Sequence, residues 1–126
     1  MTPKEVVERW VELFNAGDAD ALVTLYHDDA VNHQVAETLV DGRAAIHDMF
    51  RREFATAEMT CIPEVVHEAG DVAILEWRDP AGLRGCGFFT VREGRIVSAR
   101  LLGQALASST AQPAHPARVI AALAAR

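Results

Sequence analysis

Two amide side chains and one histidine stand together in the segment YHDDAVNHQ. Asn32 and Gln34 occupy alternate positions, so in an extended strand both side chains share one face, while His33 points to the other. The two amides could orient a carbonyl or hydroxyl group of a ligand, or they could bond a neighbouring loop, and both interpretations stay open. His33 is a candidate general base, although a lone histidine is more often structural.

One carboxylate, Asp79, directly follows a strand-like run that contains Trp77. If the Asp79 side chain points inward beside Trp77, it could act as a catalytic base. The segment Asp79-Pro80-Ala81-Gly82 is also ordinary turn chemistry, in which the aspartate side chain bonds the backbone of the turn. The turn is the favoured interpretation, and a catalytic role for Asp79 is the alternative.

Metal ligands and cofactor motifs are not indicated. The five histidines share no H-x-x-x-H spacing, and Cys61 and Cys86 form no C-x-x-C pair. We therefore expect neither a metal nor another cofactor. Two separate cysteines in a cysteine-poor chain fit a reducing compartment, which predicts a cytoplasmic protein.

Charge and hydropathy exclude two classes of partner. The chain of 126 residues has a formal net charge of −6 and no basic cluster, which argues against nucleic acid and against an anionic membrane surface. No apolar run approaches the ~20 residues of a membrane span, and the charged start MTPKEVVERW lacks the apolar core of a signal peptide. The length favours one domain.

Three segments show helical periodicity. Apolar residues recur with helical spacing at Val6, Trp10, Leu13 and Phe14, behind a possible Thr2 cap. The spacing predicts helices over Pro3–Ala16, Ala19–Tyr26 and Arg43–Ala55.

Strand-like segments make up most of the remainder. The period-two pattern and turn residues predict strands over Ala30–Gln34, Met59–His67, Val72–Arg78, Gly85–Val91 and Ile96–Leu102, with the last three as an antiparallel meander. In Val72–Arg78 the residues Ala73, Leu75 and Trp77 should face inward. The domain should span residues 1–106, and residues 107–126 should form a tail with a possible short helix.

The order of elements is α+β, and particular motifs resemble a known group. Tyr26, Asp28, Asp29 and Ala30 match a Y-x-DDA turn, Gly42, Arg43 and Ile46 match a GR-x-x-I helix start, and Gly94, Arg95 and Ile96 match the last strand turn. Over Pro3–Gly103 the chain resembles the SnoaL-like and ketosteroid-isomerase proteins of the nuclear transport factor 2-like (NTF2-like) superfamily. The resemblance implies a cone-shaped barrel, with three N-terminal helices packed on a curved antiparallel sheet, and a homodimer through the sheet.

The catalytic residues of the superfamily do not carry over. The ketosteroid-isomerase resemblance places Trp10 at the phenol position, Gln34 at the base and Gly87, with neighbour Cys86, at the second acid. A glutamine cannot abstract a proton from carbon. The resemblance to limonene-epoxide hydrolases retains one aspartate, Asp79, and places Trp77 and Leu101 where an arginine and the second aspartate belong.

Two function hypotheses follow. In the first, a cofactor-free isomerase, cyclase, hydratase or hydrolase binds an apolar oxygenated metabolite, and Asp79 or His33 moves the proton. In the second, the protein is a non-catalytic ligand-binding or dimeric association module. The predicted ligand contacts in either case are Trp10, Phe14, Tyr26, Asn32, Gln34, Phe50, Trp77, Phe89 and Leu101.

Overall fold

The first two helices begin at side-chain caps. The computed structural model describes residues 1–34 and 39–103. Helix α1 (Pro3–Asn15) begins at a capping box, in which Glu5 N donates to Thr2 Oγ1 at 3.2 Å and Thr2 N donates to Glu5 Oε1 at 2.9 Å. Helix α2 (Ala19–Val23) begins at Asp18, whose Oδ1 accepts from Ala21 N at 3.0 Å. The two predicted helices are confirmed, although α2 ends before Tyr26.

Helix α3 and the sheet follow. Helix α3 (Arg43–Thr56) begins after Gly42, whose φ of 95° suits glycine. The strands are β1 (Tyr26–Gln34), β2 (Val40–Asp41), β3 (Ile62–Ala69), β4 (Val72–Arg78), β5 (Arg84–Arg92) and β6 (Arg95–Gly103). They form one six-stranded sheet in the order β2-β1-β6-β5-β4-β3, with the predicted meander from β4 to β6.

The expected antiparallel sheet is wrong at one pairing. Strand β1 runs parallel to β6, with Asn32 beside Ala99 and Gln34 beside Leu101, so the sheet is mixed. This pairing joins distant parts of the chain, and the local pattern of either strand carries no information about its direction relative to the other. The fold is α+β with an open sheet, whose edges are β2 and β3 in the described part of the chain, so closure into a cone-shaped barrel stays a prediction.

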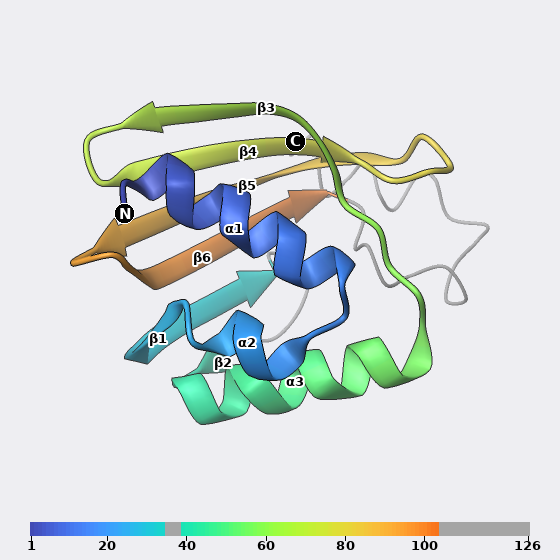
Figure 1. Cartoon of the computed structure of the whole chain (residues 1–126), viewed down its shortest axis with the longest axis horizontal. Coiled ribbons are helices and arrows are strands. Elements are labelled where there is room, and N and C mark those ends of the chain that lie inside the picture. The colour runs from blue at the N-terminus through green and yellow to red at the C-terminus, as the bar shows by residue number, and fades with distance from the viewer. Residues whose placement is uncertain (35–38, 104–126) are drawn as a thin grey trace.

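All three helices lie on one face of the sheet (Figure 1). Only α1 and α2 precede the sheet, because α3 follows β1 and β2. Helix α1 packs on β3, β4 and β5, while α3 packs on β1, β2 and α2. None of the helices in residues 1–34 and 39–103 is long and apolar enough to cross a membrane. The predicted tail, and any helix in it, falls in 104–126, outside the described residues.

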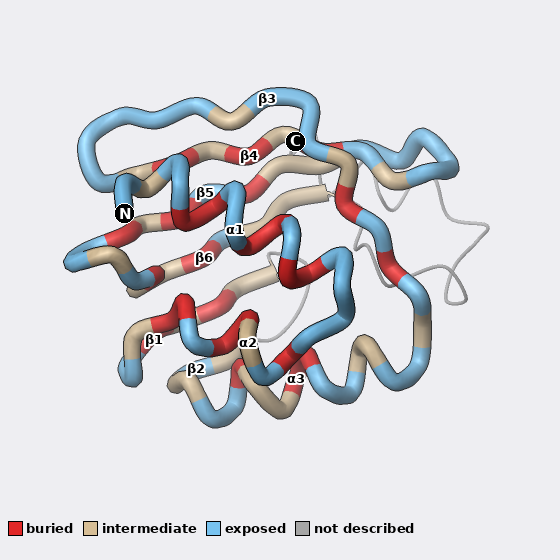
Figure 2. The backbone as a smooth tube through the Cα atoms, in the orientation of Figure 1, coloured by how far each residue is buried: buried red, intermediate tan, exposed pale blue. Residues whose placement is uncertain are grey.

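The core fills the space between the helices and the sheet. The predicted inward residues of β4, Ala73, Leu75 and Trp77, are buried, and their neighbours along the strand are less so (Figure 2). On the opposite face of the sheet Val65 and Phe88 are 42% and 39% exposed. The alternation of β4 therefore predicted its two faces correctly.

Candidate functional site

A cavity of about 510 Å³ lies between α3 and the edge of the sheet at β1 and β2. Asn32 and Gln34 reach it from alternate positions of β1. The α3 residues at its wall are spaced i, i+3, i+4 and i+7, so they share one helix face. The lining is Asn32, Gln34, Val40, Met49, Arg52, Glu53 and Thr56.

Asn32 is a buried amide with one unused atom. Asn32 is 1% exposed, and its Nδ2 atom donates a hydrogen bond to Met49 Sδ at 3.8 Å. A thioether sulfur accepts but cannot donate, which places the amide nitrogen toward Met49. Asn32 Oδ1 has no hydrogen-bond partner among the described residues. An unpaired buried polar atom costs about 1–3 kcal/mol, and this oxygen is itself enclosed by protein atoms.

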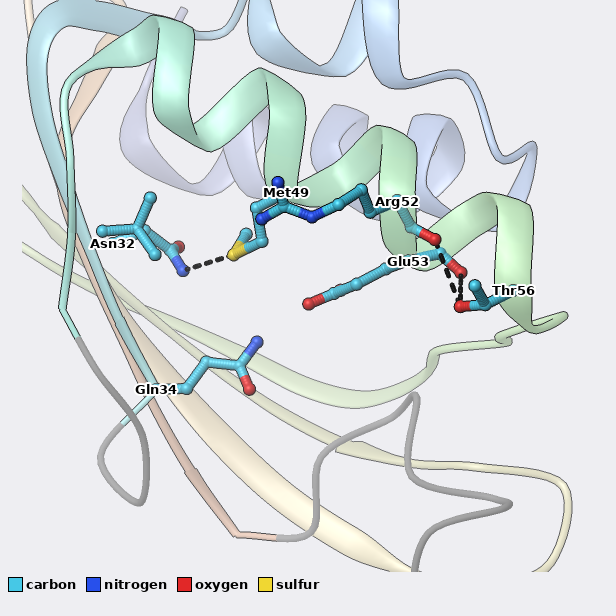
Figure 3. A pocket seen from close by; sticks show the side chains of 7 residues that line it. Asn32, Gln34, Met49, Arg52, Glu53 and Thr56 are labelled. Carbon is cyan, nitrogen blue, oxygen red and sulfur yellow. Dashed lines mark hydrogen bonds between the residues drawn. The ribbon is translucent and has the colours of Figure 1, made fainter.

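Glu53 supplies a carboxylate to the same cavity. The residue is half-buried, and its side chain extends from α3 into the space between Met49 and Gln34 (Figure 3). Burial raises the pKa of the Tyr26 phenol far above its ordinary value, the hydrogen bond from Trp10 offsets part of this rise, and the charge of Glu53 adds to it. The Glu53 charge is therefore felt in the interior of the protein.

The remaining polar groups of the wall are held by local bonds. Arg52 pairs with Asp48 one turn earlier on α3. Thr56 Oγ1 lies 3.1 Å from each of the carbonyl oxygens of Arg52 and Glu53, to which it donates. These bonds stiffen the last two turns of the helix and hold the cavity wall in place.

The predicted aromatic contacts are packed against one another in the core. The ring of Trp10 lies 4.9 Å from that of Phe14, 5.4 Å from that of Phe89 and 6.4 Å from that of Phe50. Trp10 Nε1 donates to Tyr26 Oη at 2.9 Å, and both side chains are buried. These five residues belong to the hydrophobic core and are not among the residues that line the cavity, so their role as ligand contacts stays a prediction.

Trp77 lies beside Gly87, the position that the ketosteroid-isomerase resemblance assigns to the second acid. A Cβ atom added at Gly85 would lie 2.6 Å from Trp77 Cζ2, and one added at Gly87 would lie 2.5 Å from Leu101 Cδ2 and 3.4 Å from Trp77 Cζ3. Two glycines of β5 therefore make room for the indole and for Leu101. The absence of an acid at Gly87 has a packing reason, because any side chain there would need this space.

Asp79 and His33 lie away from the cavity lining. Asp79 Oδ1 accepts from Ala81 N and Leu83 N, each at 2.9 Å, so the carboxylate organises the turn between β4 and β5. His33 is in register with the exposed Arg100, on the sheet face opposite the buried Asn32. The structure brings Asn32 and Gln34 together but not Asp79 and His33, and a catalytic role for the latter pair stays a prediction.

Metal-ligand geometry is not found in the described part of the chain, where no group of three or more histidine, cysteine, aspartate or glutamate side chains is placed to hold an ion. His47 and His67 each meet one carboxylate, Asp20 at 2.7 Å and Glu76 at 3.0 Å, on the protein surface. The cavity wall offers amide, carboxylate, guanidinium and thioether groups, which are suited to hydrogen bonding and proton transfer.

Comparison with known proteins gives the family. The sequence profile of the SnoaL-like domain matches residues 7–99. No curated protein matches the sequence. The chain belongs to the SnoaL-like domain family, as the sequence motifs predicted.

Solved structures agree on the fold. The epoxide hydrolase/cyclase-like enzyme SalBIII, described in pyran ring formation in the polyether salinomycin, is 27% identical over 79% of this chain and 88% of its own, with a TM-score of 0.69. A putative polyketide cyclase from Pseudomonas putida is 21% identical over 82% and 92%, with a TM-score of 0.74. An NTF2-like protein of unknown function from Mesorhizobium loti is 26% identical over 77% and 86%, with a TM-score of 0.67.

The α3 side of the cavity was absent from the sequence predictions. A signal for it existed, since Met49 and Glu53 lie four residues apart beside the core stripe of Ile46, Phe50 and Phe54. The sequence pattern does not show which element packs against that face of α3. In the structure this element is β1. The missed residues are Val40, Met49, Arg52, Glu53 and Thr56.

Proposed function

We propose that this protein binds an apolar, oxygen-bearing small molecule in the cavity between α3 and β1. The observation that carries the proposal is Asn32, a fully buried amide whose Oδ1 atom has no partner in the described residues and which lines the cavity. Ligand sites are usually apolar with a few placed polar groups, and Met49 and Val40 beside Asn32 and Gln34 fit that composition.

The proposed chemistry is cofactor-free isomerisation, cyclisation, hydration or hydrolysis. Its support is membership of the SnoaL-like family and the similarity to SalBIII, an epoxide hydrolase/cyclase-like enzyme. Fold alone does not select a reaction, so the argument for catalysis rests on the groups in the cavity. We also propose that the sheet and the helices close around this cavity as a cone-shaped barrel.

A non-catalytic binding module is the second candidate. It is favoured by Asp79, the one carboxylate retained from the epoxide-hydrolase template, because two backbone amides of a turn already engage its Oδ1 atom. A binder would use Asn32 and Gln34 in the same way but would leave its ligand unchanged.

We further propose that the protein forms a homodimer through its sheet and that it is cytoplasmic. The sheet face opposite the helices carries the partly exposed apolar side chains Val65 and Phe88, and we propose that a second copy of the chain covers it. The thiol of Cys61, which is buried in the core, is consistent with the proposed cytoplasmic location.

The test is ligand-induced thermal stabilisation of the wild type and two variants. The panel contains cyclic ketones, enones, epoxides, lactones and aromatic polyketide fragments. A ligand at about 100 times its Kd should add about 2.7 kcal/mol of stability to the wild type. Asn32→Leu should abolish the shift, and the control His33→Leu, on the opposite face of β1, should retain it.

The variant should remain folded without ligand. Leucine has nearly the shape of asparagine and removes an amide whose oxygen is buried without a partner, so the unliganded Asn32→Leu protein should be no less stable than the wild type. Equal ligand shifts in the wild type and Asn32→Leu would place the site elsewhere. An absence of any shift in the wild type would contradict the proposal.

A further inference from the structure

We infer that the contact between Gly87 of β5 and Leu101 of β6 limits the size of the ligand, and that the ligand is a compact molecule of one or two rings. This inference rests on the proposed function and adds a size class and a specificity-determining pair of residues to it. Neither residue is among those that line the cavity. Together they decide how much space β6 leaves beside β1.

Leu101 is the next residue along the sheet from the cavity. It is paired with Gln34 of β1 on one side and with Gly87 of β5 on the other. Paired residues of neighbouring strands share a face of the sheet, so Leu101 lies on the same face as Gln34, which lines the cavity. The direction in which Leu101 leans therefore changes the width of the cavity at this end.

Leu101 leans away from the cavity because Gly87 has no side chain. A Cβ atom added at Gly87 would lie 2.5 Å from Leu101 Cδ2, so this methyl group occupies the space that any other residue would need there. Neighbouring strands are about 4.8 Å apart, and a leucine directed toward β5 leaves the β1 side of its own strand open. The described lining of the cavity comes accordingly from β1, β2 and α3.

The sheet is filled beyond Leu101. Phe89 Cε1 and Trp77 Cζ3 lie 3.0 Å and 3.4 Å from the position of the added Cβ atom at Gly87, and both residues are buried. A fused polycycle lying along the sheet would need the space that these side chains and Leu101 occupy. A molecule of one or two rings needs only the cavity of about 510 Å³ on the β1 side.

The experiment is a size series of cyclic ketones with one, two, three or four fused rings. Binding to the wild type, Leu101→Ala and Gly87→Ala is measured by thermal shift, and Kd is determined by calorimetric titration. The wild type should bind the members with one and two rings. Leu101 is only half-buried, so the alanine variant should fold.

The two variants should change the size limit in opposite directions. Leu101→Ala joins the cavity to the space at Gly87, so the three-ring ketone should bind about tenfold tighter than to the wild type. In Gly87→Ala the new methyl group turns Leu101 toward β1, because Phe89 and Trp77 close the other side. The two-ring ketone should then bind about tenfold more weakly.

Two control variants separate ligand size from stability. Leu102→Ala removes the same atoms from the next residue of β6, on the opposite face of the sheet, and should bind like the wild type. In Gly85→Ala the new methyl group has Trp77 and the Leu102 carbonyl as its nearest neighbours. This variant should lose stability but keep the size limit.

A comparison without ligand tests the contact itself. The stability lost through Gly87→Ala should be smaller in the Leu101→Ala background than in the wild type, because the methyl group that it meets is absent there. Equal losses in the two backgrounds, measured by urea unfolding, would refute the contact as the reason for the lean of Leu101.

The outcomes separate this inference from the proposed function. Binding with one size limit in the wild type, Leu101→Ala and Gly87→Ala would refute the role of the pair and leave the site intact. Wild-type binding of the four-ring ketone as tightly as the one-ring ketone would refute the size class. Binding of no ketone by any of the proteins would contradict the proposed function, and with it the size limit.

Discussion

At the scale of single residues, Asn32 and Cys61 represent two kinds of buried polar group. Asn32 lines the cavity and carries a buried oxygen that has no partner among the described residues, which is a cost to stability. Cys61 is buried in the core, and its backbone is bound by Asn15, which accepts from Cys61 N at 2.7 Å and donates to Cys61 O at 2.9 Å. The first residue therefore belongs to the proposed binding site and the second to the stability of the fold.

The buried thiol of Cys61 makes stability fall at alkaline pH. Burial raises the pKa of Cys61 from 9.0 to about 12. Above the unfolded value the unfolded chain has lost this proton while the folded protein retains it, so the free energy of unfolding decreases by up to about 1.4 kcal/mol per pH unit until the folded pKa is reached. The buried Tyr26 phenol, whose pKa is also raised, acts in the same direction at still higher pH.

Urea unfolding of the wild type and Cys61→Ala at about pH 8, 9 and 10 measures this contribution. The variant should be less stable at pH 8 because it loses buried volume, but its stability should decline less steeply with pH. Parallel declines in the two proteins would contradict the assignment of the pH dependence to this thiol.

At the scale of elements, β5 determines how much of the space under the helices is filled. Gly85 and Gly87 allow Trp77 and Leu101 to lie directly against the strand, and these two side chains fill the space next to Gly87, where the template acid would stand. The cavity remains instead at the other end of the helical layer, between α3 and β1.

The two glycines should respond differently to alanine. At Gly85 the new methyl group would lie 2.6 Å from Trp77 and 2.7 Å from the backbone oxygen of Leu102, which cannot move without distorting β6. We expect Gly85→Ala to lower the free energy of unfolding by about 1–3 kcal/mol.

Gly87→Ala is the matched comparison, because its nearest neighbour is the flexible end of Leu101 at 2.5 Å. Rotation of Leu101 relieves that contact, so the loss of stability should be smaller than for Gly85→Ala. Denaturant unfolding measures both, and an equal or greater loss for Gly87→Ala would show that the packing of β5 is not limited by the Leu102 carbonyl.

At the scale of the whole molecule, the sheet has one covered face and one that the helices leave uncovered (Figures 1 and 2). Phe88 lies on the uncovered face, opposite Ile74 in the register of β4 and β5, and is 39% exposed. An aromatic side chain at this position favours burial against another surface.

The proposed homodimer should depend on Phe88. Light scattering after gel filtration should give the wild type roughly twice the 13.7 kDa of the chain, and Phe88→Glu should shift it to the monomer, because burying an unpaired charge at an interface is costly. Glu8→Ala, on the helical face, is the control and should stay dimeric. A monomeric wild type would contradict the proposed interface.

The sequence by itself determined the elements and most of their faces. Helix caps such as Thr2 and the alternation of Ala73, Leu75 and Trp77 depend on neighbours within a few residues, so local chemistry was sufficient. The same alternation placed Asn32 and Gln34 on one face of β1, and both line the cavity. The family motifs were likewise short and local, and the SnoaL-like assignment is confirmed.

Only the tertiary structure decided which faces meet and how much space they leave. The parallel pairing of β1 with β6 joins Gln34 to Leu101, and no periodicity within either strand encodes it. Glu53 becomes a neighbour of the β1 amides only because α3 packs on β1, whereas Asp79 is turned to its own loop. Periodicity sets the direction of a side chain within its element, but a cavity exists only where side chains from distant elements fail to fill the volume between them.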